Sequence, residues 1–243
     1  MKSFTAIYLL VAVVVIVQSK SLNKREHVVY NTRQKAMIQR HKQAVQNGTQ
    51  IQMRYGEWFA QRWPGGHVPY VISDSFSFQD RQEIIDTLRY LESVSCFQFE
   101  ERRDENNYVE YVTGDSCWSS IGMQGGYQKV ILSSPSCIDR PDIMHETMHA
   151  LGLSHEHQRH DRDKYVRIHM ENVMSGSEDN FDLANFDTMG LPYDYYSIMH
   201  YHSKEFSKNE RPTITAKRRG VTLKRPTRLS RIDLKKLKII GDC

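Results

Sequence analysis

Three histidines and a glutamate between positions 145 and 155 have the residue types and the spacing of a metal site that does chemistry. His145 and His149 are four residues apart, so on a helix their side chains lie on one face, one turn apart. Two imidazole nitrogens on such a face can bind one metal ion at about 2.0–2.1 Å. Glu146 directly follows the first histidine, where it can reach a metal-held water without binding the metal itself. The pattern therefore predicts metal-assisted hydrolysis.

Gly152 provides the turn that a third ligand requires. Glycine accepts the left-handed backbone that ends many helices, so the chain can turn back and bring His155 to the metal. Three protein ligands leave one position open, which is typical of a catalytic zinc site rather than a closed structural one. The short pattern H-E-x-x-H also occurs by chance in surface helices, but H-E-x-x-H-x-x-G-x-x-H is far more specific. The sequence therefore predicts one Zn²⁺ per chain.

These residues need a scaffold, and the apolar pattern predicts an α+β scaffold in two lobes with the metal on the floor of the cleft. Ile84, Leu88 and Leu91 have helical spacing, whereas short alternating stretches elsewhere are typical of strands. Ser230 is suited to capping the start of the last predicted helix. The predicted strands cover residues 68–72, 96–99, 108–112 and 129–133, and the predicted helices cover residues 78–91, 143–151 and 229–237.

The first 19 residues have the form of a secretory signal peptide and are not expected to belong to the fold. Lys2 precedes an apolar run from Ala6 to Val17, and the small residue Ser19 follows. The run is shorter than the roughly 20 residues that a transmembrane helix needs, and no other stretch is long and apolar enough to span a bilayer. We therefore expect a secreted, extracellular protein without a membrane span.

An even number of cysteines, four, follows the predicted signal peptide. In a secreted chain such a number predicts disulfides, and four cysteines allow three pairings. A cysteine-bound zinc site is the alternative, but the paired C-x-x-C spacing of such sites is absent. The cysteines are Cys96, Cys117, Cys137 and Cys243.

Positive charge is concentrated in two parts of the chain, whose formal net charge is +4. Residues 20–54 are basic and too poor in large apolar side chains to bury a core, so they form either a disordered leader or a propeptide. The C-terminal cations form either a solvated face or a docking surface for an acidic matrix or cell surface. A nucleic-acid partner is not expected, because no recognisable binding module is present. The C-terminal cations are Lys217, Arg218, Arg219, Lys224, Arg225, Arg228, Arg231, Lys235, Lys236 and Lys238.

Several segments are together specific to one known family. HETMHALGLSHEHQRHDRD (145–163) is followed by SIMHY (197–201) and preceded by RWPGGHVPYVIS (62–73) and CWSSIGMQGGYQKVILSSPSC (117–137). In these segments the chain resembles the astacin family of metzincin zinc endopeptidases. The resemblance runs from about residue 62 to the last residue and is weak before residue 55.

The resemblance implies a fold and roles for further residues. The N-terminal lobe is expected to hold a twisted, mostly parallel sheet with the active-site helix, and the C-terminal lobe to be irregular with a closing helix. Met199 would pack below the metal, and Tyr201 would bind the resting metal and then stabilise the oxyanion. Residues 117–124 would form the sheet edge on which an extended peptide substrate lies. The implied disulfides are Cys96–Cys243 and Cys117–Cys137.

The resemblance also implies synthesis as a zymogen. An activating protease would remove a propeptide, residues 20–54, so that the catalytic domain, residues 55–243, begins at Tyr55. The freed amino group would approach Glu156, a carboxylate that follows the third histidine and would otherwise be buried without a partner. The family's F-x-G-D segment, whose aspartate blocks the metal, has no match in this propeptide, so the source of latency is left open. Asn47 begins the only N-glycosylation sequon.

The residue that selects the substrate side chain just after the scissile bond is not settled by the resemblance. Family members that prefer an acidic residue there carry an arginine in a G-Q-R segment. The equivalent segment here is Lys224-Arg225-Pro226, with proline at the arginine position. An acidic preference would therefore have to come from Arg225 or Arg228.

The sequence thus predicts a secreted, monomeric zinc endopeptidase that cleaves extended peptide or protein substrates. The alternative is a catalytically silent relative that binds peptides or matrix. A silent relative would normally lack a metal ligand or the base, whereas this chain retains all of them. The retained residues are His145, Glu146, His149, His155 and Tyr201.

Overall fold

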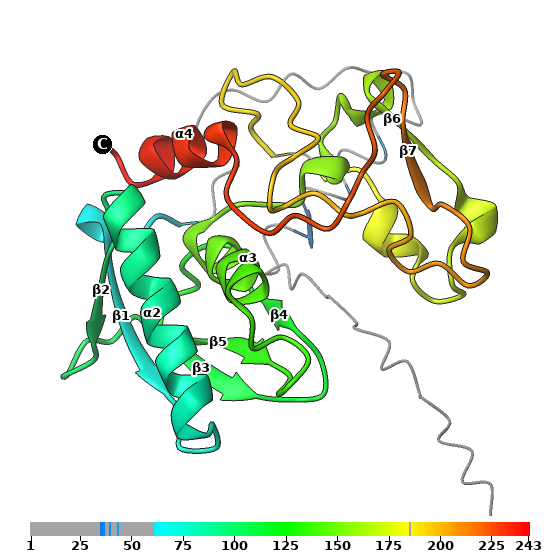
Figure 1. Ribbon diagram of the computed structural model, residues 1–243. Helices are drawn as coiled ribbons and strands as arrows, with labels where there is room; N and C mark the ends of the chain where they lie inside the picture. Colours follow the sequence, from blue (N-terminus) through cyan, green and yellow to red (C-terminus); the bar gives the residue numbers. More distant parts are fainter. Residues whose placement is uncertain (1–34, 37–38, 40–42, 44–60, 185) are drawn as a thin grey trace, which may run out of the picture.

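The computed structural model describes residues 35, 36, 39, 43, 61–184 and 186–243 (Figure 1). The predicted signal peptide, Asn47 and the predicted cleavage point after Arg54 lie outside the described residues. The described domain has two lobes with separate hydrophobic cores, one around strands β1–β5 and helices α2–α4 and one around strands β6 and β7. This arrangement confirms the predicted α+β fold in two lobes.

A five-stranded sheet spans the first lobe in the order β2-β1-β3-β5-β4. All neighbouring strands are parallel except β4, which pairs antiparallel with β5 at one edge of the sheet. Alternate residues of β1 and β5 are buried, which is the period of two expected for strands with one covered face. The strands are β1 (His67–Ile72), β2 (Gln98–Glu101), β3 (Tyr108–Thr113), β4 (Trp118–Ser119) and β5 (Tyr127–Leu132).

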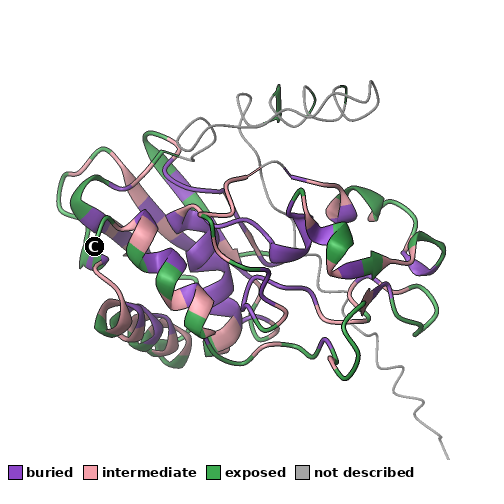
Figure 2. Cartoon of the chain, turned by 90° about the horizontal axis from the view of Figure 1, so that it is seen from above, coloured by how far each residue is buried: buried purple, intermediate pink, exposed green. Residues whose placement is uncertain are grey.

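Two helices, α2 (Phe78–Val94) and α3 (Arg140–Leu151), pack against each other, and α3 also packs on β5. Ser77 forms a capping box with the first turn of α2, which fixes the start of that helix. Helix α3 is buried on every side from Asp142 to Leu151 (Figure 2). A buried helix that carries two histidines and a glutamate must satisfy these polar groups internally, so α3 positions them for a specific partner.

The predicted strands and helices of the first lobe are present with shifted bounds. The strand predicted at residues 96–99 begins at Gln98, because a bend at Ser95 and Cys96 follows the end of α2. Helix α3 begins three residues before its predicted start, because the Asp139 side chain caps it and Pro141 fits its first turn.

The second lobe contains little regular structure. Strands β6 (Val166–Ile168) and β7 (Ile214–Ala216) form an antiparallel pair over an aromatic core, and the sequence pattern predicts neither strand because each has only three residues. None of the helices in the described part of the chain has both the length and the apolar character of a membrane span. The 3₁₀ helices among the described residues of both lobes are η1 (Pro64–Gly66), η2 (Glu156–Gln158), η3 (Arg162–Lys164), η4 (Met170–Asn172) and η5 (Glu178–Phe181).

Helix α4 (Arg231–Ile240) closes the domain and holds the turn that precedes Tyr201. Ser230 caps α4 as predicted, and Asp233 completes the capping box. The Asp233 carboxylate also accepts hydrogen bonds from Ser197 Oγ at 2.6 Å and from the Ile198 backbone N–H at 2.8 Å. One buried carboxylate therefore joins the start of α4 to the turn at residues 197–199.

Lys236 of α4 is only 5% exposed, and its ammonium group contacts one carboxylate oxygen of the fully buried Glu156. The other oxygen accepts hydrogen bonds from Arg159 Nη1 at 3.0 Å and from the Asp194 backbone N–H at 2.9 Å. The expectation that Glu156 lacks a partner before cleavage is therefore wrong. Two internal cations already compensate its charge, as a buried carboxylate requires.

Two disulfides fasten the chain around these contacts. Cys96, which follows α2, is joined to Cys243, which follows α4. Cys117, which precedes β4, is joined to Cys137, which precedes α3. These pairs are the two that the family resemblance implies.

The Lys236→Met variant tests whether the buried ion pair stabilises the domain. Without the ammonium group Glu156 keeps only Arg159 as a cation, so we expect the free energy of unfolding to fall by about 2–4 kcal/mol. Urea denaturation measures the change. The matched control is Lys235→Met, because Lys235 is the exposed neighbour on the same helix and its loss should cost less than about 0.5 kcal/mol. Equal effects of the two substitutions would contradict a stabilising role for the ion pair.

Candidate metal centre

The structure brings His145, His149 and His155 together at the C-terminal half of α3. Gly152 has φ +117°, the left-handed conformation that glycine tolerates, and it ends α3 at Leu151. The chain then returns so that His155 Nε2 lies 3.1 Å from His145 Nε2 and 3.2 Å from His149 Nε2. The predicted role of Gly152 in the turn thus agrees with the observed backbone.

The contacts of the Nδ1 atoms of His145 and His149 show which nitrogen of each ring carries the proton. His145 Nδ1 lies 2.8 Å from the Ile198 carbonyl oxygen, and His149 Nδ1 lies 2.7 Å from the Leu153 carbonyl oxygen. A carbonyl oxygen only accepts, so both Nδ1 atoms carry the proton and both Nε2 atoms have a free lone pair. Such backbone contacts are the usual means by which proteins orient histidine ligands.

A cation is the partner that this arrangement fits. His155 Nε2 lies 3.1–3.2 Å from the Nε2 atoms of both other histidines, which carry lone pairs, and can donate a hydrogen bond to at most one of them. Zinc–nitrogen bonds of about 2.0–2.1 Å in tetrahedral geometry place neighbouring nitrogens about 3.3 Å apart. The observed separations and the all-histidine donor set therefore fit Zn²⁺, and the three residues are the metal-binding cluster of the described residues.

Burial favours the neutral, metal-binding form of His149 and of His155. It lowers the pKa of His149 and of His155 well below the ordinary value for histidine, and the neighbouring imidazoles lower both further. The proton therefore does not compete effectively with a metal near neutral pH.

The turn beneath the cluster holds the predicted accessory residues. Met199 is fully buried, and its carbonyl oxygen accepts a hydrogen bond from the Glu156 backbone N–H at 2.9 Å. The Tyr201 ring is 3% exposed and lies 4.5 Å from the His155 ring, centroid to centroid. Glu146, at 2% exposure, follows His145 on α3. The predicted base, Glu146, thus lies on α3 with two of the ligands. The predicted tyrosine, Tyr201, follows the turn whose Ile198 carbonyl oxygen contacts His145.

The remaining nearby histidines support the centre from outside it. His157 stacks on Tyr201 with ring centroids 4.0 Å apart, and its Nε2 lies 3.0 Å from the Asn180 carbonyl oxygen. His200 is buried, and its Nε2 lies 2.8 Å from the Tyr193 hydroxyl. His200 Nδ1 also lies 2.7 Å from the Tyr201 carbonyl oxygen, so these contacts orient the Tyr201 ring and its backbone.

Strand β4 lies at the sheet edge beside the centre, within the predicted edge of residues 117–124. The Gly122 backbone N–H donates to the carbonyl oxygen of His149 at 2.8 Å, which connects this edge to helix α3. The Met123 backbone N–H donates to the Gln61 carbonyl oxygen at 2.9 Å. The backbone of the edge is therefore held next to the metal ligands and partly paired.

Sequence reasoning missed three residues that hold this site. Asp233 was recognisable as a cap from its spacing to Ser230, but its bonds to the turn at residues 197–198 depend on tertiary structure. Lys236 was counted among the surface cations, although it is buried on Glu156. Glu205 was not identified, because its importance comes from its place beside the metal centre.

Known proteins are similar to this chain over the region that contains the metal centre. A family model described as Astacin (Peptidase family M12A) matches residues 57–240. Zinc metalloproteinase nas-12 of Caenorhabditis elegans is 40% identical over 190 residues, which cover 75% of this chain and 49% of that protein. The low choriolytic enzyme of Oryzias latipes is 38% identical over 159 residues, which cover 63% of this chain and 59% of that protein. The chain thus spans about half the length of the curated relatives that it matches.

Solved structures agree with this result. High choriolytic enzyme 1, a hatching enzyme zinc-protease from Oryzias latipes (medaka), superimposes with a TM-score of 0.72 at 32% identity. The match covers 79% of this chain and 98% of that structure. Myroilysin shares the fold at 18% identity and a TM-score of 0.56. With a family model that matches most of its length and an intact three-histidine centre, the chain belongs to the astacin family, peptidase family M12A.

Proposed function

We propose that this chain is a zinc endopeptidase that cleaves extended peptides and is made as a secreted zymogen. The observation that carries the proposal is the convergence of the Nε2 atoms of His145, His149 and His155 at the helix that also carries the buried Glu146. Family membership agrees with it, and no catalytic position of the predicted set is substituted. The catalytically silent alternative has no feature of these residues in its favour.

The residues divide the work of hydrolysis between them. A bound zinc ion supplies Lewis acidity, which polarises a peptide carbonyl and makes a neighbouring water acidic. Glu146 is placed to take the proton from the attacking water and to deliver it to the departing amine. The Tyr201 hydroxyl is placed to donate a hydrogen bond to the oxyanion of the tetrahedral intermediate. Burial of both residues excludes bulk water, which strengthens these interactions.

Backbone pairing with the sheet edge accounts for how an extended substrate is held. Among the described residues strand β4 pairs with β5 on one side only, so the part of residues 117–124 that precedes the paired Gly122 and Met123 can add a substrate strand on its other side. Such pairing reads the peptide backbone and is indifferent to side chains. Selectivity must then come from a pocket that receives a side chain next to the scissile bond.

The Glu146→Ala variant tests the proposed base. It should retain one zinc ion per chain, measured by metal analysis, and still bind peptide, while cleavage falls by about 10²–10⁴-fold or more. Removal of zinc from the wild-type protein by a chelator should abolish cleavage, and added zinc should restore it. Glu171→Ala, which removes an exposed carboxylate on η4, is the control and should cleave normally. Undiminished cleavage by Glu146→Ala would remove Glu146 from the mechanism.

The Tyr201→Phe variant tests the proposed oxyanion donor. Loss of one such donor typically costs about 2.7–4 kcal/mol, so kcat should fall by about 10²–10³-fold while KM changes little. Steady-state kinetics on one peptide measure both constants. Tyr195→Phe is the control, because the Tyr195 hydroxyl donates only to the Tyr165 carbonyl oxygen, away from the metal ligands. A change confined to KM would contradict the oxyanion role of Tyr201.

The zymogen and secretion proposals rest on residues outside the described part of the chain. We place a signal peptide at residues 1–19 and a propeptide at residues 20–54, with a glycan at Asn47 that leaves with the propeptide. An activating protease would cut after Arg54. Because Lys236 and Arg159 already pair with Glu156, the freed amino group of Tyr55 is not needed to compensate that carboxylate. Docking of the exposed C-terminal cations to an acidic matrix stays a prediction.

Expression of the full chain in a secreting host tests the processing scheme. The medium should contain two forms, one that begins near Lys20 and is inactive and one that begins at Tyr55 and is active, as read by N-terminal sequencing. Arg54→Gln should block the conversion without blocking secretion. Equal activity of the long and the short form would contradict a propeptide that covers the active site.

A further inference from the structure

A pocket of about 160 Å³ opens directly beside the metal centre. Its wall includes His145 and Tyr201, so a side chain that enters it belongs to a substrate residue next to the scissile bond. Three charged residues also line the pocket, namely Asp142 from the first turn of α3, Glu205 from the second lobe and Arg225 from the loop before α4. The charge of the occupant therefore depends on how these three groups are already paired.

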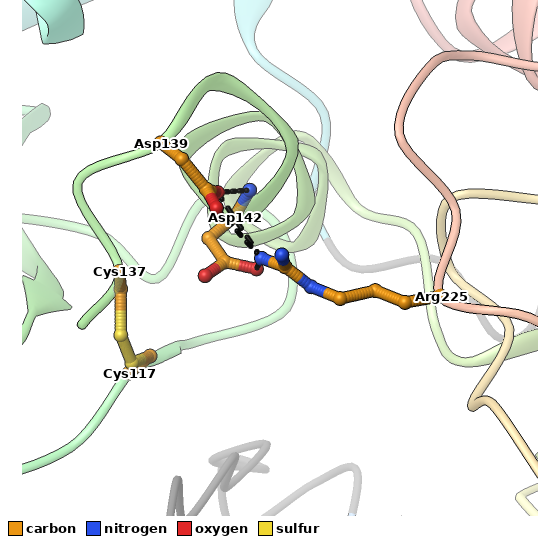
Figure 3. Close-up of a disulfide and its surroundings, with 5 residues drawn as sticks. All are labelled: Cys117, Cys137, Asp139, Asp142 and Arg225. Atoms are coloured by element: carbon orange, nitrogen blue, oxygen red, sulfur yellow. Dashed lines mark hydrogen bonds and ion pairs between the residues drawn. A yellow bond between two sulfur atoms is a disulfide. The ribbon is translucent and has the colours of Figure 1, made fainter.

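Arg225 is bound by carboxylates of its own chain (Figure 3). Its Nη2 lies 2.5 Å from Asp142 Oδ1, 2.9 Å from Asp139 Oδ2 and 3.2 Å from Asp139 Oδ1. Two carboxylates thus share one guanidinium group. The Arg225 side chain is 45% exposed whereas that of Asp142 is 9% exposed, so water screens the cation more than the anion that faces the pocket. Arg225 is therefore a poor recognition group for an acidic side chain.

Glu205 adds a second carboxylate to the pocket, and no lysine or arginine among the described residues pairs with it. Its Oε2 lies 2.7 Å from His202 Nε2, and its side chain is only 15% exposed. The Lys204 backbone N–H lies 3.1 Å from His202 Nδ1, which fixes the orientation of the ring. The His202 Nε2–H points at Glu205, and this hydrogen bond orients the carboxylate.

We propose that this pocket selects a cationic side chain, lysine or arginine, at the substrate residue directly after the scissile bond, with Asp142 and Glu205 as the selecting residues. Two largely buried carboxylates face the pocket, and its one guanidinium group is half-exposed and shared between Asp142 and Asp139. A long side chain with a terminal cation can fill the pocket and reach them, with a charge-assisted hydrogen bond as the expected contact. The proposal rests on the proposed peptidase function and specifies its substrates.

A bound zinc ion adds positive charge near the pocket, so the test must separate the pocket carboxylates from the metal. Variants that change only a carboxylate of the pocket keep the metal charge constant. The quantity to compare is the ratio of kcat/KM between peptides that differ at one residue. In this ratio the contribution of the metal, of backbone pairing and of the other subsites cancels.

The experiment uses the processed, zinc-loaded protein and four peptides that are identical except for Lys, Arg, Leu or Glu after the cleaved bond. We expect the Lys and Arg peptides to be cleaved about tenfold or more better than the Glu peptide, with the Leu peptide between them. Glu205→Gln and Asp142→Asn should each lower the Lys-to-Glu ratio several-fold. Arg225→Met should raise the ratio, because it removes the one cation of the wall.

The controls separate selectivity from folding and from catalysis. Glu171→Gln makes the same charge change outside the pocket and should leave the ratio unchanged. Asp142 lies in the first turn of α3, so Asp142→Asn can impair folding; Glu205→Gln, outside any helix, then carries the test. The Glu146→Ala background gives dissociation constants for the same peptides without cleavage, and these should follow the same order.

The outcomes are distinct. A wild-type preference for the Glu peptide that disappears in Arg225→Met would overturn the proposal and make Arg225 the selecting residue. Equal cleavage of the Lys and Glu peptides by the wild type, or a ratio that Glu205→Gln leaves unchanged, would also overturn it. Failure of the wild type to cleave any peptide would instead contradict the proposed function, and the binding constants would still report on the charge preference of the pocket.

Discussion

Three buried imidazole nitrogens that face one another at 3.1–3.2 Å are the constraint on which the rest of this domain depends. Burial removes the rings of His145, His149 and His155 from water and brings their Nε2 atoms together, an arrangement that a cation between them would stabilise. The fold produces this arrangement at the end of α3, where Gly152 reverses the chain and two backbone carbonyls fix the ring orientations. The site is preorganised for metal before any substrate arrives.

A second buried network holds helix α4 against the chain segments around that site. Asp233 binds the turn below the metal, and Lys236, one helical turn later, binds Glu156 next to the third ligand. Helix α4 therefore contacts two segments that follow α3 in the chain and border the metal centre, namely the turn at residues 197–199 and Glu156. Cys243 ties the end of α4 to Cys96 in the first lobe, which limits how far these contacts can separate. Catalytic geometry and closure of the domain are in this way supported by the same helix.

Much of the first lobe and of the metal site was predictable, because both depend on local patterns. Ligand spacing, the glycine turn and the caps at Ser77 and Ser230 operate within a few residues. The second lobe was not predictable, since its strands are three residues long and its core is built from aromatic side chains far apart in sequence, such as Phe181 and Phe206. The pairing of Glu156 with Lys236 was not predictable for the same reason, because the two residues lie 80 positions apart.

The C-terminal stretch shows why a count of charges is a poor guide to the field inside a cleft. Its many lysines and arginines suggest a positive surface, yet Lys236 is buried against Glu156 and Arg225 is shared between Asp139 and Asp142. The potential felt by a substrate side chain depends on how the groups that face it are buried and shared rather than on net charge. In the pocket beside the metal centre, two carboxylates face one guanidinium group that a third carboxylate also binds. A basic chain can therefore present an acidic pocket, and pairing within the fold decides the sign.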